Sequence, residues 1–230
     1  MNSSNNKPAI SVSIWLGLVV VAILLVGGVC WGMWPMNHVA TGSSQRDFTM
    51  DIDFDKFRQI MVRKNATESL VAHSGMKLLN EEVNELSIDI PKQKHPILNA
   101  VLGKSNADVS ASKQITVSLD NPDIDTKEMI LNQHAQMNSE QMDVTTQASK
   151  PAGNLTDYST RLRATKIDAG TKVELTINQS VNVKVPNVFV SEANRRVQQA
   201  AANSTAEQEK AIRAFISKYQ KDAIILPDLH

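Results

Sequence analysis

The chain has 230 residues, of which 42% are hydrophobic and 21% charged, and its 24 basic side chains balance 24 acidic ones to a formal net charge of zero. This balance argues against a nucleic-acid-binding protein, which normally carries a basic excess, and against a disordered, highly charged tail protein. The length suits one domain of ordinary size with an appendage.

An uncharged stretch marks the appendage at the amino end. No Asp, Glu, Lys or Arg occurs from Pro8 to Gln45, and an apolar run of 21 residues extends from Ile14 to Trp34. As a helix this run would span about 31 Å, close to the thickness of a bilayer core. All three Trp residues lie near its ends, where indole rings favour the membrane interface.

The amino-terminal pattern predicts a cytoplasmic tail over residues 1–9, a transmembrane helix over residues 10–34 that contacts the lipid bilayer, and a linker over residues 35–45. A cleaved signal peptide is the alternative, although its apolar region is usually shorter. Residues 46–230 would then form an extracytoplasmic domain.

Charge and cysteine content indicate where that domain would lie. Lys7 and the free amino group precede the apolar run, which favours a cytoplasmic amino end. The single cysteine, Cys30, lies inside the run, so the exported domain would hold no disulfide. This fits a bacterial periplasmic domain. We therefore expect a single-pass protein of the bacterial inner membrane.

Hydrophobic periodicity predicts the order of elements in residues 46–230. Alternation from Phe48 to Asp55 indicates a half-buried strand. Helical spacing from Phe57 to Lys64, then a capping-box pattern from Asn65 to Glu68, indicates two short helices. Alternation of period two then predicts six strands, around residues 76–90, 109–119, 129–137, 142–148, 158–164 and 173–185.

The end of the chain combines a long strand with helical segments. A hairpin signal at residues 168–171 leads into the strand over residues 173–185, whose length suits a strongly curved sheet. Helical stripes follow over residues 190–201 and 205–219. The sequence leaves open whether Asn203 and Ser204 divide this segment into two helices.

The order of these elements, from "FTMDIDFD" to "VFVSEANRRVQQAAANSTAEQEKAIRAFISKYQ", resembles the helix-grip domain of the START-like, pollen-allergen-like (SRPBCC) lipid-binding superfamily over about residues 47–220. The resemblance rests on topology and not on a signature motif. It implies an α+β fold in which a curved antiparallel sheet of about seven strands, with two short helices, grips a long C-terminal helix around an apolar cavity. The implied activity is binding or carrying a hydrophobic molecule.

Three polar side chains interrupt otherwise apolar strand faces: Lys113, Gln133 and Gln179. A ligand pocket needs a few polar groups among apolar walls, so these residues are candidates for binding a ligand's head group. The alternative is a bulge or register shift that turns each of them outward.

No constellation in the sequence predicts a metal, a cofactor or a reaction. Asp51, Asp53 and Asp55 share one predicted strand face and could attract a divalent cation, but we interpret them as a solvated or edge-protecting strand face. None of the five histidines has metal-binding spacing. No nucleophile elbow or phosphate-binding loop occurs. We therefore expect a protein that is not an enzyme.

Two functions follow from this reading. The first is a membrane-anchored periplasmic protein that binds a hydrophobic or lipid-like ligand without catalysis and has no nucleic-acid partner. The second is a scaffold or interaction subunit of a bacterial envelope assembly, in which the terminal helix or a sheet edge contacts a protein partner.

Overall fold

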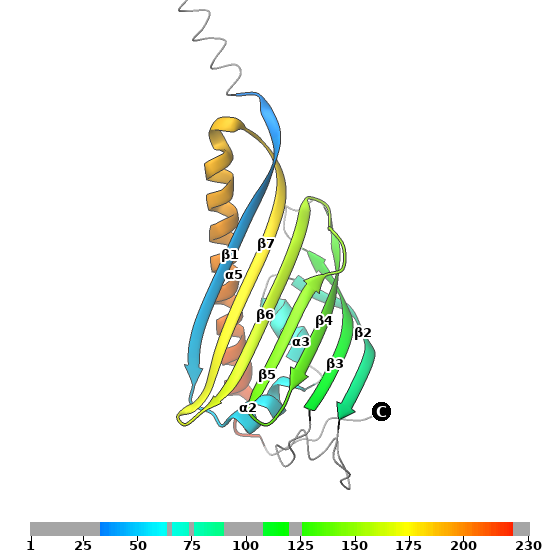
Figure 1. Cartoon of the computed structure of the whole chain (residues 1–230), viewed down its shortest axis with the longest axis vertical. Coiled ribbons are helices and arrows are strands. Elements are labelled where there is room, and N and C mark those ends of the chain that lie inside the picture. The colour runs from blue at the N-terminus through cyan, green and yellow to red at the C-terminus, as the bar shows by residue number, and fades with distance from the viewer. Residues whose placement is uncertain (1–32, 64–65, 74–75, 90–107, 120–125, 223–230) are drawn as a thin grey trace, which may run out of the picture.

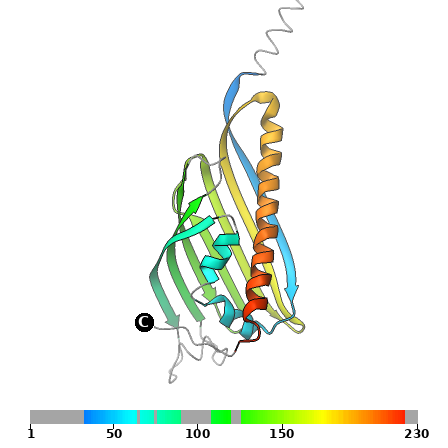
Figure 2. The ribbon, with the colours of Figure 1, turned by 180° about the vertical axis from the view of Figure 1, so that it is seen from behind.

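The computed structural model describes residues 33–63, 66–73, 76–89, 108–119 and 126–222. These residues form a seven-stranded antiparallel sheet, two short α-helices and a long C-terminal helix (Figures 1 and 2). The elements in chain order are β1 (Pro35–Met50), α2 (Phe54–Met61), α3 (Ala66–His73), β2 (Met76–Asp89), β3 (Asp108–Leu119), β4 (Glu128–Met137), β5 (Gln141–Ala148), β6 (Leu155–Ile167), β7 (Gly170–Pro186), a 3₁₀ turn (Asn187–Phe189) and α5 (Val190–Tyr219). The predicted order of strands and helices is confirmed.

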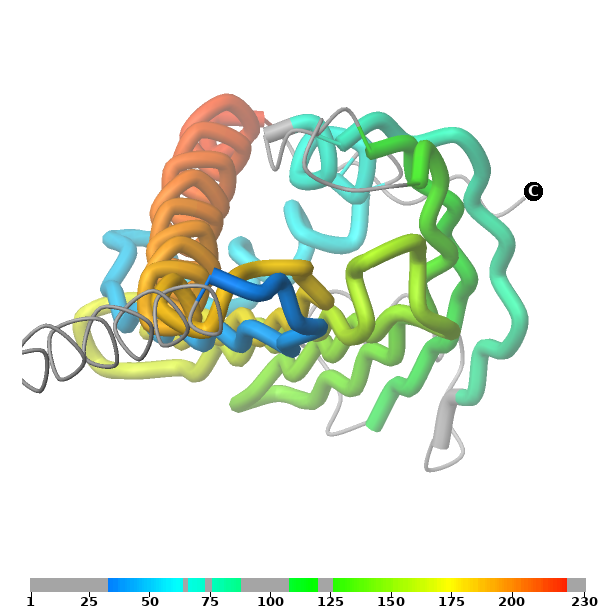
Figure 3. Tube along the Cα trace, turned by 90° about the horizontal axis from the view of Figure 1, so that it is seen from above, coloured from blue at the N-terminus to red at the C-terminus, as the bar shows by residue number. Residues whose placement is uncertain are grey.

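The sheet is a meander with its first strand added at the far end. Its strand order is β1-β7-β6-β5-β4-β3-β2, and every neighbouring pair is antiparallel. Seen from above, the sheet curves from β1 round to β2, with α5 beside β1 and α3 near β2 (Figure 3). The concave face of the sheet therefore faces the helices.

Residues 35–45 are not a linker. They form the first part of β1, which pairs with β7 in one continuous register from Pro35 opposite Pro186 to Met50 opposite Thr171. The small residues Ala40 and Gly42 on this part are buried. The prediction failed because small and polar residues hide the period-two pattern here, and because only the pairing with β7 and the contact with α5 make the segment a strand.

The strand predicted from Phe48 to Asp55 ends earlier than expected. It ends at Met50, and the side chain of Asp53 accepts hydrogen bonds from the backbone N–H groups of Asp55 and Lys56. This is a helix N-cap, which satisfies amide groups that have no partner inside the helix. The cap starts α2 and places Asp51, Asp53 and Asp55 outside any strand.

The C-terminal segment is one unbroken helix of 30 residues, α5, so Asn203 and Ser204 do not divide it. At Gly42 the backbone of α5 approaches β1 so closely that a Cβ atom would overlap the carbonyl group of Val197. Beside this contact, the Gln198 side chain accepts a hydrogen bond from the Ser43 amide at 3.0 Å and donates one to the Ser43 carbonyl at 2.6 Å. The helix thus protects part of the exposed edge of β1.

The predicted membrane location is corrected. In the part of the chain that the structure describes, no helix has the length and apolar character needed to cross a membrane. Residues 1–32, which hold the predicted tail and most of the span predicted over residues 10–34, lie outside the described residues. The single-pass inner-membrane assignment, the periplasmic location and the bilayer contact therefore find no support.

Candidate ligand-binding pocket

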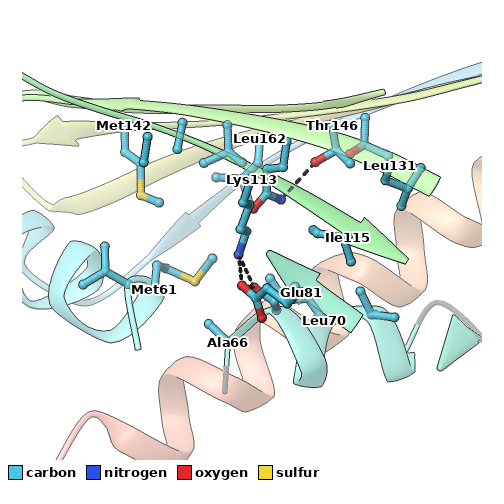
Figure 4. A pocket seen from close by; sticks show the side chains of 18 of the residues that line it. Met61, Ala66, Leu70, Glu81, Lys113, Ile115, Leu131, Met142, Thr146 and Leu162 are labelled. Atoms are coloured by element: carbon cyan, nitrogen blue, oxygen red, sulfur yellow. Dashed lines mark hydrogen bonds and ion pairs between the residues drawn. The ribbon is translucent and has the colours of Figure 1, made fainter. Parts of the chain in front are cut away.

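A pocket of about 590 Å³ lies between the concave face of the sheet and the helices (Figure 4). Strands β2 to β7 form its floor, and α3 lies across it with Ala66, Thr67, Leu70 and Val71. Met61 at the end of α2, with Gln208 and Ile212 of α5, completes the wall. The four α3 residues share one helix face, because Leu70 and Val71 follow Ala66 and Thr67 by about one turn.

The strand register arranges the floor of the pocket in rows that run across the sheet. One row is entirely apolar and consists of Ala111, Ala135, Val144, Leu162 and Leu175, each opposite the next on the neighbouring strand. Because side chains alternate between the faces of a strand, the residue two positions along each strand points to the same face. The next row is therefore also on the floor of the pocket.

That next row is polar. Lys113 lies opposite Gln133, Gln133 opposite Thr146, and Thr146 opposite Thr160, so four adjacent strands each contribute one polar side chain. All four line the pocket. The Gln133 Nε2 atom donates a hydrogen bond to the Thr146 hydroxyl at 3.0 Å. We call Lys113, Gln133, Thr146 and Thr160 the polar row. It crosses a surface that is otherwise largely apolar.

An ion pair lies at the β3 end of the polar row (Figure 4). The Lys113 ammonium donates hydrogen bonds to the Glu81 carboxylate at 2.6 Å and to the Thr67 hydroxyl at 2.5 Å. Thr67 comes from α3 and Glu81 from β2, so three separate elements meet at this point. The side chains of Lys113 and Glu81 are 21% and 26% exposed, which leaves both accessible from the pocket.

Glu81 reaches the pocket because of a bulge in β2. The register with β3 shifts between Leu78 and Asn80, where β2 contains one extra residue. A bulge of this kind reverses which residues of a strand face the core. Without it, Glu81 would lie on the opposite face from Leu78. A second shift follows between Val83 and Glu85.

The structure places the three predicted head-group residues in two locations. Lys113 and Gln133 lie in the pocket as cross-strand neighbours. Gln179 does not line it; its Nε2 atom donates to the Val197 carbonyl of α5 at 3.1 Å. Gln179 therefore helps to attach α5 to β7, and the idea that it lines the cavity is corrected. No pattern in the sequence distinguishes Thr67, Glu81 or the two threonines of the polar row.

Tyr158 is a buried phenol at the end of the pocket near α5. It is 8% exposed, and burial raises its pKa to about 12, while its hydrogen bond to the Gln208 side chain opposes that shift. A phenol that is buried and neutral can hold a hydrogen bond but does not supply charge at neutral pH.

The raised pKa of Tyr158 predicts a loss of stability in base. Below pH 10 the phenol is neutral in both the folded and the unfolded chain, whereas between pH 10 and 12 only the folded chain retains the proton. Stability should therefore fall by about 1.4 kcal/mol per pH unit over that range from this group alone. Denaturant titrations at pH 9 and 11 measure it. The Tyr158→Phe variant should lose this component and Tyr219→Phe should keep it; equal pH slopes in both variants would contradict the assignment.

The described residues do not gather into a metal site. No group of three or more His, Cys, Asp or Glu side chains within this part of the chain could hold a metal ion. Two of the three aspartates that could attract a cation have other roles. Asp53 caps α2, and Asp55 pairs with Arg58 at 3.0 Å.

Comparison with known proteins finds solved structures of similar arrangement but no close relative. No protein-family model matches the chain, and no curated protein matches it. Similar solved structures include the protein of unknown function SA2116 from Staphylococcus aureus, at 9% identity over 80% of this chain and 99% of that one with a TM-score of 0.45. The ZhuI aromatase/cyclase from Streptomyces sp. R1128 matches at 9% identity over 79% and 97%, TM-score 0.42.

A norcoclaurine synthase from Thalictrum flavum is also similar, at 11% identity over 80% of this chain and 99% of that chain, with a TM-score of 0.42. The suspected resemblance to helix-grip proteins is confirmed at the level of the fold. The chain has the helix-grip fold, with a curved seven-stranded sheet around a long C-terminal helix.

The expectation that the chain is not an enzyme is contradicted. The finding against it is that an aromatase/cyclase and a norcoclaurine synthase are among the solved structures similar to this chain. The absence of a familiar catalytic motif was the ground for that expectation. It is insufficient, because Lys113, Glu81 and Thr67 come from three separate elements and meet only in the folded chain, an arrangement that no local sequence motif marks.

Proposed function

We propose that this protein binds a hydrophobic small molecule in the pocket between the sheet and the helices, and that Lys113 and Gln133 contact the polar group of that ligand. One observation carries the proposal: a cavity of about 590 Å³ whose walls are mostly apolar and whose few polar groups converge in one row. Small-molecule sites typically have 300–1,000 Å³ and combine apolar walls with a few placed polar groups.

The arrangement of the rows supports a defined orientation for the ligand. The apolar part of the molecule would lie over the row that contains Val144, Leu162 and Leu175, where burial removes apolar surface from water. Its polar part would lie at the polar row, where donors and acceptors replace the hydrogen bonds lost to water. A ligand with both parts gains from both surfaces at once.

Filling the cavity should abolish binding. Ala135 lies on the pocket floor near the end of β4, and the side chain of Ala135→Trp would occupy the space over the apolar row. We expect this variant to bind a neutral solvatochromic dye, Nile red, at least tenfold more weakly than the unmodified chain. Fluorescence titration measures the affinity, and thermal unfolding checks that the variant is folded.

His134→Trp is the matched control, because His134 is the preceding residue of β4 and is exposed on the opposite face. Its affinity for the dye should stay within twofold of that of the unmodified chain. Equal dye affinity in a folded Ala135→Trp variant, or no binding of the dye to the unmodified chain, would overturn the proposed function.

A further inference from the structure

The charges around the pocket are balanced in pairs. Of the described residues that line it, three are charged: Arg63, Glu81 and Lys113. Lys113 pairs with Glu81 at 2.6 Å, and Arg63 pairs with Asp222 at 3.0 Å. The pocket surface formed by the described residues therefore offers donors and acceptors without an uncompensated charge.

From this balance we infer that the pocket selects uncharged amphiphiles, such as alcohols and ketones with an apolar chain, and that Glu81 is the residue that rejects carboxylates. This inference rests on the proposed function and names the chemical class of its ligand. Glu81 acts as a specificity residue through its charge, at the β3 end of the polar row.

The geometry gives a neutral oxygen favourable partners. A ligand carbonyl or hydroxyl at the polar row can accept a hydrogen bond from the Lys113 ammonium, and a hydroxyl can also donate to the Glu81 carboxylate. Bonds that involve an ionised partner are the stronger ones. A neutral head group therefore replaces its water contacts without bringing a new charge into the pocket.

A carboxylate meets a different balance. Its transfer from water into a mostly apolar pocket carries a large desolvation cost, which a cation that is not already paired would offset most effectively. The only lysine among the described lining residues already has Glu81 at 2.6 Å. Attraction of a carboxylate to Lys113 is then largely opposed by repulsion from Glu81, because the two charged groups lie only 2.6 Å apart.

A matched pair of ligands tests the inference. Decanol and decanoate have the same chain length, and decanoate is ionised at pH 7.5; displacement of bound Nile red gives the affinity of each. Because any apolar pocket favours decanol to some degree, the informative quantity is the change in the ratio of the two affinities between variants. Glu81→Gln removes one charge at nearly constant shape and should shift this ratio toward decanoate by at least tenfold.

Two further variants define the origin of that shift. The double variant Glu81→Gln with Lys113→Gln removes both charges and should restore the preference of the unmodified chain for decanol. Glu82→Gln removes the same charge from the next residue of β2, which is exposed on the other face, and should leave the ratio within twofold.

The outcomes separate this inference from the proposed function. An unchanged ratio in Glu81→Gln, or tighter binding of decanoate than of decanol by the unmodified chain, would overturn the selection rule while leaving the pocket as a binding site. Failure of the dye and of both ligands to bind the unmodified chain would overturn the proposed function and the inference with it.

Discussion

Replacing Arg58 by alanine should lower the free energy of unfolding by about 3 kcal/mol, because it removes a large buried side chain and the hydrogen bonds of a charged donor. The Arg58 side chain is 1% exposed although it is charged. Its guanidinium donates to the Asn138 carbonyl at 2.5 Å and to the Asp55 carboxylate at 3.0 Å. Burial lowers the pKa of Arg58, and the nearby Asp55 and Asp53 oppose that shift.

This arginine attaches α2 to the turn between β4 and β5. Without it, the Asn138 carbonyl loses a charged donor and the core around Phe54, whose ring lies 5.7 Å from the guanidinium carbon, is left with a cavity. Arg58→Met would retain the apolar contacts and should recover part of the loss. Because α2 ends at Met61 in the pocket wall, weaker dye binding should accompany the lower stability.

Arg196→Ala is the matched control for the Arg58 prediction. Arg196 pairs with Glu192 at 3.0 Å, but the arginine side chain is 77% exposed and the pair lies on the outer face of α5. Exposed ion pairs of this kind contribute less than about 1 kcal/mol. Urea denaturation of both variants measures the difference; a similar loss in the two, or no loss in Arg58→Ala, would contradict the anchoring role of Arg58.

Gly42→Val is expected to cost about 2–3 kcal/mol, in the upper part of the range for overpacked cores. A side chain at residue 42 would meet the backbone of Val197 and Gln198, which belongs to a long helix and cannot rotate aside. The helix would move away from β1, and the hydrogen bonds between Gln198 and Ser43 would break. Faster hydrogen exchange of the Ser43 amide should therefore accompany the loss of stability.

Thr41→Val tests whether the effect comes from the helix contact. Thr41 precedes Gly42 on β1 and is exposed on the opposite face, so the same new side chain meets solvent there. Substitutions at such positions usually change stability by less than about 0.5 kcal/mol. An equal loss of stability in the two variants, measured by denaturant midpoint, would show that close approach of α5 is not the reason for a glycine at residue 42.

The sequence was sufficient for the order of elements because most strands alternate apolar and polar residues over their full length. The run from Val173 to Val185 is the clearest case, and it lies within β7. The strand over residues 35–45 was missed because its strand character depends on a partner segment, Pro186 to Thr176, that lies between 151 and 131 residues further along the chain. Local periodicity carries no information about that pairing.

The site was only partly predictable for a similar reason. Lys113 and Gln133 stood out because each interrupts an apolar strand face, and the structure brings both to the pocket. Glu81 could not be found, since its orientation depends on a bulge at Leu78 and Asn80 that has no marker such as glycine or proline. Gln179 gave the same sequence signal as Lys113, yet it contacts α5, because only the three-dimensional course of the helix decides which part of the concave face stays open.

The most direct test of the pocket as a binding site is methionine-methyl NMR of the chain during titration with decanol. Met61, Met76, Met137 and Met142 line the pocket from α2, β2, β4 and β5, whereas Met36 lies near the start of β1 and is largely exposed. The account predicts saturable shifts of the four pocket methyl signals, contacts between them and the decanol chain, and an unchanged Met36 signal. Shifts confined to Met36, or no saturable shift at the pocket methionines, would contradict it.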